Sequence, residues 1–363
     1  MLGANIYRGS SFGATHPLAI PRIPTVIDLS RALGWLPPEQ YRTSPRAKPK
    51  ALEAFHTAEY IAALSAAEAT QSVTAEVRSR FQIGTTSNPI YPEMFRRPAT
   101  GVGGAMLAAQ ILKDGGEVHH PAGGTHHGLP DRANGFCFFN DPVFAVLAFQ
   151  AQGLSRIVYV DIDAHHCDGV EAAFVASDTV RMISVHEEKR WPFTGTLSDD
   201  AGGAAFNLPV PRGLHDDDFA LILNDLILPA VSGFRPDALI LQCGVDAMIE
   251  DPLSRLCLTG RSYLSAVSAL RNIAPRFLVL GGGGYNPWSV GRTWTAIWGH
   301  LNGHPVAEPL PPAAQGILRA LRWSHRLGKA PPEHWFTTLL NPPNHGPVSE
   351  VVRARVQALR GRL

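Results

Sequence analysis

The 363-residue chain contains few cysteines and few charged residues. Its four cysteines, Cys137, Cys167, Cys243 and Cys257, show no CxxC spacing, and a chain of this length does not need disulfides for stability, so we expect reduced thiols. Charged residues are 17% of the chain, against the roughly one quarter usual in globular proteins. This composition excludes a disordered chain, and a net charge of +1 with scattered basic residues gives no sign of direct nucleic-acid binding.

The chain also lacks long apolar runs. No segment approaches membrane-spanning length without glycine, proline or charge, and residues 1–12 have no basic patch followed by an apolar stretch. We therefore expect a cytoplasmic protein without a membrane partner. There is no repeat, low-complexity tract or linker, and hydrophobic residues are 45% of the chain, so we expect one domain over 1–363, with a helical cap at about 313–363.

Strand-like and helix-like patterns alternate along the chain. This alternation predicts an α/β fold with a mainly parallel sheet, helices on both faces and a site at the carboxyl ends of the strands. The predicted strands are 117–119, 157–160, 180–185, 238–241 and 277–280, and the clearest helical patterns are 143–152, 216–231, 261–273 and 288–298.

A dense group of metal-binding side chains follows the predicted strand 157–160. If the strand continues, Asp161, Asp163 and His165 lie on one face. Buried carboxylates are costly unless they are paired or bind a metal, and this donor set suits Zn²⁺, or else Mn²⁺ or Fe²⁺. An alternative, a capping cluster for a helix that starts near Val170, explains only Asp168.

Other predicted strands also end in reactive residues. With Asp163 and His165, Asp246 would complete a three-ligand zinc site whose open position holds water of lowered pKa. His126 and His127 are then candidate bases, although they also fit a structural pair. Tyr285 follows four glycines on what we expect to be a mobile loop, where its hydroxyl could stabilise an oxyanion. The same glycines also fit a phosphate-binding loop.

These motifs, in this order, resemble the zinc-dependent histone deacetylase family, which includes bacterial acetoin-utilisation proteins and acetylpolyamine amidohydrolases. The resemblance covers most of the chain. It is carried by the motifs at 15–17 with Arg22, 55–60, 124–127, 135–141, 161–169, 242–246 with 251–252, and 281–285.

The resemblance implies a zinc-dependent amidohydrolase. By this resemblance, Asp163, His165 and Asp246 are zinc ligands. His127 with Asp168 is the general base and then the acid, His126 with Asp161 is an electrostatic helper, and Tyr285 polarises the carbonyl. The walls of an acyl-lysine tunnel would be Gly135, Phe136 and Trp191, with Leu253 and Pro252 at its rim and Arg22 behind the metal. A potassium ion would bind near Asp161, Asp163, His165 and Ser184.

Two positions depart from the family pattern, and a loop beside one of them is also notable. Cys167 stands where the family usually has glycine, and a packing role is favoured over a redox role. Asn88 takes the place of the acidic rim residue that holds the substrate backbone in many histone-directed members, which weakens the case for tight peptide binding. The loop 89–97 is rich in aromatic and basic residues and could narrow the entrance or form a subunit contact, so the oligomeric state stays open.

Three alternatives to an acyl-lysine deacylase remain. One is a deacylase of acetylpolyamines or other small molecules, which the change at Asn88 keeps open. Another is a binuclear Mn²⁺ ureohydrolase, although 243–248 offers only one acid, Asp246. The last is a non-catalytic acyl-amine binding module, which is disfavoured because both histidines and Tyr285 are present.

Overall fold

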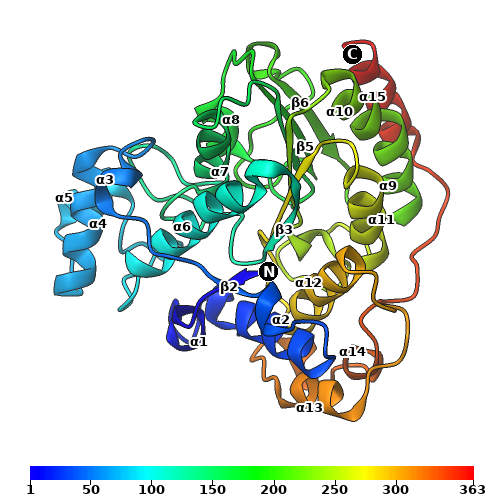
Figure 1. The fold of residues 1–363 in the computed structure, drawn as a ribbon, viewed down its shortest axis with the longest axis horizontal. Coiled ribbons are helices and arrows are strands. Elements are labelled where there is room, and N and C mark those ends of the chain that lie inside the picture. The colour runs from blue at the N-terminus through cyan, green and yellow to red at the C-terminus, as the bar shows by residue number, and fades with distance from the viewer.

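A computed structural model describes all 363 residues, and a six-stranded parallel sheet lies at its centre (Figure 1). The order of the strands is β3-β8-β7-β4-β5-β6. The predicted parallel α/β architecture is therefore confirmed. The strands are β3 (Gly116–His120), β4 (Ile157–Asp161), β5 (Val180–Glu187), β6 (Ala205–Val210), β7 (Ala238–Gln242) and β8 (Arg276–Leu280), and a separate two-stranded sheet pairs β1 (Leu2–Gly3) with β2 (Arg42–Thr43).

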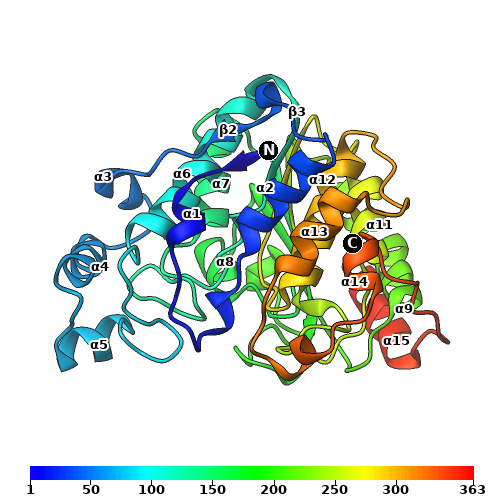
Figure 2. The ribbon, with the colours of Figure 1, turned by 90° about the horizontal axis from the view of Figure 1, so that it is seen from below.

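Helices cover both faces of the sheet (Figures 1 and 2). Successive side chains of a strand point to opposite faces, so Val158 and Val160 of β4 join one apolar cluster while Ile157 and Tyr159 join the other. The first cluster includes side chains of α2 (Arg22–Ala32), α9 (Asp216–Ile222), α10 (Leu228–Phe234), α11 (Gly260–Leu270) and α12 (Pro287–Leu301); the second includes side chains of α6 (Arg96–Ile111), α7 (Asp141–Gln150) and α8 (Asp168–Ala173).

The C-terminal segment packs on the same core as the sheet. It contains α13 (Pro312–Ala320), the short α14 (His334–Thr337) and α15 (Glu350–Arg360). Leu318 of α13 and Val352 and Val356 of α15 are buried in the cluster that includes Val158 and Val160. The segment is helical, as the sequence predicts for residues 313–363.

Helices near the N-terminus form a lobe beside the sheet (Figures 1 and 2). The lobe contains α3 (Pro49–Leu52), α4 (Ala58–Thr70) and α5 (Ala75–Phe81), and α1 (Ile6–Gly9) precedes it in the chain. Its apolar cluster also contains Tyr91, Met94 and Phe95. The aromatic side chains of the loop 89–97 are therefore buried and do not narrow the entrance, while a subunit contact by this loop stays a prediction. None of the helices is both long enough and apolar enough to cross a bilayer.

Candidate active site

The site lies where four neighbouring strands end. β3, β8, β7 and β4 are successive neighbours in the sheet, and parallel strands bring their carboxyl ends to one edge. The loops after them carry His126 and His127, Tyr285, Asp246 and the residues from Asp163 onward. The structure therefore brings these loops together at one edge of the sheet, as the sequence predicts.

β4 ends at Asp161, so the strand does not continue to His165 as the alternation suggested. Asp163 and His165 lie in the loop that follows. The backbone N–H of Asp163 donates to Asp161 Oδ1 (3.0 Å), and the N–H of His165 donates to Asp163 Oδ1 (3.0 Å). These side-chain to backbone bonds turn the chain, so Asp161 separates from the other two residues.

Asp163, His165 and Asp246 form a buried group with metal-binding geometry. One ligand atom from each lies within 4.8 Å of the other two. His165 Nδ1 is 2.9 Å from Asp246 Oδ2 and 3.2 Å from Asp163 Oδ1. Two carboxylates and one imidazole whose ligand atoms lie this close together form the donor set of a three-ligand catalytic metal site.

Glycines allow the two carboxylates to approach the loop after β8. A Cβ atom on Gly283 would lie 2.1 Å from Asp246 Oδ2, and one on Gly244 would lie 1.9 Å from Asp163 Oδ2. The N–H of Gly283 instead donates to Asp163 Oδ2 (2.7 Å). The glycine loop is buried and packed, which corrects the expectation of a mobile loop.

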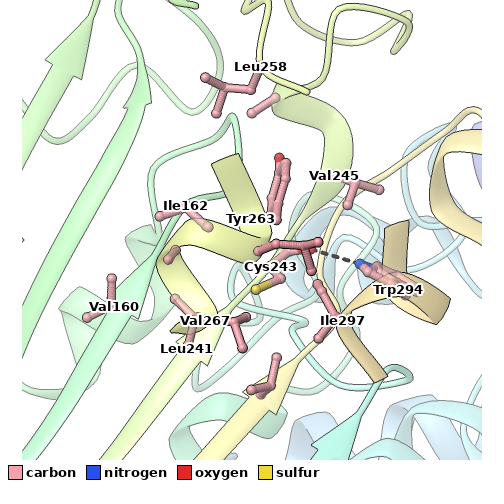
Figure 3. Packing of buried hydrophobic residues seen from close by; sticks show 14 of the residues in the cluster. Val160, Ile162, Leu241, Cys243, Val245, Leu258, Tyr263, Val267, Trp294 and Ile297 are labelled. Atoms are coloured by element: carbon pink, nitrogen blue, oxygen red, sulfur yellow. Dashed lines mark hydrogen bonds between the residues drawn. The ribbon is translucent and has the colours of Figure 1, made fainter. Parts of the chain in front are cut away.

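The core beneath β7 supports the position of Asp246 (Figure 3). Trp294 Nε1 donates to the carbonyl oxygen of Cys243 (2.9 Å), and the hydroxyl of Tyr263 donates to that of Gly244 (2.7 Å). Both side chains are fully buried. They fix the backbone just before Asp246, whose Oδ1 accepts from the N–H of Ala164 (2.9 Å).

Each of the two adjacent histidines contacts a different aspartate. His126 Nδ1 is 2.7 Å from Asp161 Oδ2, and His127 Nδ1 is 2.6 Å from Asp168 Oδ1. Asn134 Nδ2 donates to the other oxygen of Asp168 (2.9 Å). The expected pairs therefore form. The capping alternative for Asp168 does not hold, because the side chain at the start of α8 contacts His127 instead.

The two histidines also differ in charge state. Burial lowers the pKa of His127 to about 4 against the opposing effect of Asp168. Burial also acts to lower the pKa of His126, but the charges of Asp161 and Asp163 outweigh it and raise the pKa to about 9. His127 is thus the neutral imidazole of the two, able to accept a proton.

Tyr285 lines the same cavity as Trp191. Its N–H donates to Asp251 Oδ2 (2.6 Å), and its ring centroid is 5.8 Å from that of Phe136. Burial, together with the charge of Asp246, raises the pKa of its phenol well above the usual value of 10. The hydroxyl therefore carries its proton at neutral pH and can donate a hydrogen bond.

These residues open into a cavity of about 450 Å³. Gly135, Phe136, Trp191 and Leu253 line it, together with His127, His165 and Tyr285. Gly135 has a φ of +51°, and a Cβ there would lie 2.2 Å from the Trp191 ring, so the narrow wall requires glycine. Pro252 lines a neighbouring cavity instead.

Asn88 does not lie on the rim. Its side chain is buried, its Oδ1 accepts from the N–H of Phe136 (3.0 Å), and its Nδ2 donates to the carbonyl oxygen of Gln82 (3.2 Å). The oxygen and the nitrogen of the amide are thus both occupied by hydrogen bonds, and the bond to Phe136 supports the cavity wall. Ser87 lines the cavity in its place, which corrects the prediction that Asn88 contacts substrate.

Three further predicted positions lie around the site. Arg22 Nη1 donates to the carbonyl oxygen of Gly282 (2.6 Å), behind the metal group. Ser184 is the register partner of Asp161 across β4 and β5, and its Oγ is 3.0 Å from His186 Nδ1. Cys167 is buried with φ −78°, a conformation that needs no glycine, and burial raises the pKa of its thiol. The packing interpretation of Cys167 is therefore favoured.

The sequence analysis missed several residues that position the site. Tyr159 and Gln242 form a buried contact (2.7 Å) next to Asp161, and Asn140 Nδ2 donates to the carbonyl oxygens of His126 (3.2 Å) and Gly128 (2.9 Å). Asn140 and Gln242 lie inside the quoted motifs and Asn134 directly precedes one, so their places in or beside these motifs could have revealed their roles.

The phosphate-loop alternative is not supported. The helix that follows the glycines, α12, begins at Pro287, and Asn286 Oδ1 accepts from the backbone N–H groups of Trp288 (3.0 Å) and Ser289 (3.4 Å). The donors that would bind a phosphate are therefore already occupied by a side chain of the chain itself.

Comparison with known proteins gives a consistent result. A model of the histone deacetylase domain matches residues 16–301. The acetoin utilization protein AcuC of Bacillus subtilis is 31% identical over 343 residues, covering 91% of this chain and 87% of that protein. Histone deacetylase RPD3 of Saccharomyces cerevisiae is 32% identical over 310 residues, covering 83% and 71%.

Solved structures are similar over nearly the whole chain. The crystal structure of a histone deacetylase homologue from Aquifex aeolicus has a TM-score of 0.93 at 33% identity and covers 99% of this chain and 98% of that one. A structure of such a homologue in complex with SAHA matches equally well, with a TM-score of 0.93.

Proposed function

The chain belongs to the histone deacetylase family of metal-dependent hydrolases, and from that premise we propose that it hydrolyses the amide of acetyl-lysine or a related acyl-amine. One observation carries the proposal. The metal-binding group reaches one narrow cavity through His165, and a carboxylate-held histidine and a protonated tyrosine line the same cavity.

We propose that Asp163, His165 and Asp246 hold Zn²⁺, and the fit of two carboxylates and one imidazole within 4.8 Å supports this. Fe²⁺ suits the same donors. When bound, the metal supplies a Lewis acid that polarises the carbonyl and lowers the pKa of water. A potassium ion is proposed beside it, held by oxygens of Asp161, Asp163, His165 and Ser184.

The proton transfers are assigned to His127. Its Nδ1 is held by Asp168 (2.6 Å), so its Nε2 takes the proton from the attacking water and later gives it to the departing amine nitrogen. His126, held by Asp161, acts as an electrostatic helper next to the metal group. Tyr285 donates a hydrogen bond to the carbonyl oxygen as negative charge develops there.

The cavity walls position the substrate. Aromatic faces of Phe136 and Trp191 would pack against the methylenes of an acyl-amine chain and exclude water from the reaction. His127 and Trp191 are in edge contact, with ring centroids 4.6 Å apart, which keeps the base at this wall.

The alternatives rank below this proposal. A deacylase of acetylpolyamines or other small molecules uses the same chemistry and stays the first alternative. A binuclear ureohydrolase is weaker, because the structure has a single group of three metal-binding side chains. A non-catalytic binding module is weaker still, because the chain has all the side chains proposed for catalysis, His126, His127 and Tyr285 among them.

We propose further that residues 1–363 form one deacetylase domain. The largest apolar cluster joins Met1, the sheet and α15, which supports this. A cytoplasmic location and the lack of nucleic-acid and membrane partners stay predictions.

The test is hydrolysis of an acetyl-lysine reporter by zinc-loaded protein. We expect Tyr285→Phe to lower kcat by about 10²- to 10³-fold, because it removes one oxyanion donor, and His127→Ala to lower it by about 10²- to 10⁴-fold. The matched control is Tyr41→Phe, which also removes one hydroxyl but lies outside the cavity. Unchanged rates in both Tyr285→Phe and His127→Ala would show the proposed mechanism to be wrong.

A further inference from the structure

The cavity entrance carries positive charge and no acidic side chain. Lys189, Arg190 and Arg212 are among its twelve lining residues, and none of the twelve is Asp or Glu. The whole chain has 32 Lys and Arg against 31 Asp and Glu. The excess of positive charge is therefore a local property of this entrance and does not reflect a basic protein.

Only one of these three cations is neutralised. Glu187, whose side chain is 1% exposed, accepts from Arg190 through both of its carboxylate oxygens, and Arg190 Nη1 also donates to the carbonyl oxygen of Leu253 (2.7 Å). Arg190 is thus a structural residue that fixes the rim.

Two cations remain available to a ligand. Arg212 is 74% exposed and reaches the already paired Glu187 at 3.5 Å. Lys189 is exposed and makes no ion pair within 4.0 Å. Its backbone is left-handed (φ +56°), a strained conformation for a lysine, and such conformations are enriched at functional sites.

A second cavity on the other side of Leu253 has the same character. Its volume is about 570 Å³, it shares Leu253 and Tyr285 with the first, and its lining includes Arg322 and no acidic residue. Arg322 Nη1 donates only to the carbonyl oxygens of Arg319 and Leu321 (both 2.8 Å). Each side of the rim therefore presents a cation that makes no ion pair, Lys189 in the first cavity and Arg322 in the second.

We propose that the substrate is an acyl-amine that carries a carboxylate at the opposite end of its chain from the acylated nitrogen, outside the tunnel. This inference rests on the proposed function. A carboxylate on the substrate would pair with Lys189, which makes no ion pair, and with the largely exposed Arg212, which shares Glu187 with Arg190. A polycation would be repelled. Because Asn88 is buried and has no charge, the rim offers no acid to hold a polyamine, so this inference disfavours the acetylpolyamine alternative.

The carboxylate could come from two sources, and a substrate series separates them. The series contains Nα-blocked Nε-acetyl-lysine with a free α-carboxylate, its neutral carboxamide, acetylspermidine, and acetyl-lysine peptides flanked by Glu or by Arg. We expect kcat/KM to rise about two- to fivefold for each carboxylate and to fall similarly for each cation, through KM rather than kcat. The differences should shrink in about 1 M salt. A preference for the free α-carboxylate identifies a small-molecule substrate, and a preference for the Glu-flanked peptide identifies an acidic protein segment.

Charge variants test the assignment to these side chains. Lys189→Gln and Arg212→Gln should each lower the ratio of kcat/KM for the anionic over the neutral substrate by about two- to fivefold, and Lys189→Glu should lower it further. The control is Lys113→Gln. Lys113 is exposed and lies just before the start of β3, at the end of the strand away from the site, so this change should leave the ratio unchanged. Equal rates for anionic and cationic substrates, or a preference for acetylspermidine, would overturn the charge inference alone. Absence of hydrolysis with every substrate would overturn the proposed function as well.

Discussion

The two aspartates that contact the adjacent histidines His126 and His127 have different roles. Asp161 Oδ1 accepts from the N–H of Asp163 (3.0 Å), so Asp161 holds both His126 and the metal-binding loop. Asp168 contacts His127 and is itself held by Asn134, with no link to the metal group. The first pair therefore couples a histidine to metal binding, while the second serves only a histidine that lines the cavity.

Replacing each aspartate with asparagine should separate these duties. Asp168→Asn should lower kcat by about 10- to 100-fold with normal metal content, because His127 loses its charged partner. Asp161→Asn should lower metal affinity by about 10- to 100-fold as well, because the amide cannot replace the carboxylate toward both His126 and the Asp163 backbone. Metal content by elemental analysis and single-turnover rates check both. Loss of metal in Asp168→Asn would contradict this division.

At the level of elements, the loop after β8 depends on close approach of its backbone to the carboxylates. Gly283→Ala should lower metal affinity at least about tenfold, because the new Cβ would lie 2.1 Å from Asp246 Oδ2 and 2.8 Å from Asp163 Oδ2. Gly283 does not have a positive φ, so this variant tests crowding alone. Metal titration measures it.

The control is Gly316→Ala in α13. Gly316 is exposed, and its added Cβ meets no atom within 4 Å, so this change should leave metal affinity unchanged. It should stabilise the protein by about 0.5–1 kcal/mol through helix propensity. Equal metal affinity in the two variants would refute the role given to Gly283.

The elements differ in how well local pattern predicts them. Strands such as β4 and β7 are buried on both faces and appear in the sequence as short apolar runs, so they were predicted. β6 was missed because it is an edge strand that contains Pro209, and proline argues against a strand except at an edge.

The site was predictable where a residue's role follows from its own chemistry. Asp163, His165 and Asp246 follow strands that carry them to one edge. The end of β4 at Asp161 and the burial of Asn88 depend on hydrogen bonds to backbone atoms that only the folded chain brings near. Asn88 accepts a hydrogen bond from Phe136, which is 48 residues away. No local sequence pattern predicts such a contact.

At the level of the whole molecule, one buried histidine joins the N-terminal lobe to the site. His56, which is 2% exposed, precedes α4. Its Nδ1 donates to the carbonyl oxygen of Leu129 (2.9 Å), and its Nε2 accepts from the N–H of Asn140 (3.1 Å). Asn140 in turn holds the backbone of His126 and Gly128. The lobe and the catalytic loop are thus connected through a histidine that must be neutral, because only a neutral ring can accept.

This histidine should make the protein sensitive to acid. Burial lowers the pKa of His56 to about 4, against about 6.5 in an unfolded chain. As pH falls below 6.5 the unfolded state binds the proton first, so stability is lost between about pH 6.5 and 4 and is unaffected by this residue above that range. Between pH 7 and 5 the loss from this residue should be about 2 kcal/mol.

The variant His56→Gln isolates this contribution. A glutamine carbonyl can still accept from the N–H of Asn140 but does not titrate, so the fall in urea-unfolding free energy from pH 7 to pH 5 should be smaller by about 2 kcal/mol than in the unmodified protein. His345→Gln is the control, because the side chain of His345 is 68% exposed and its replacement removes one histidine without touching the core. If His56→Gln and His345→Gln change the pH dependence equally, the loss of stability in acid arises elsewhere and the neutral His56 ring does not join the lobe to the site.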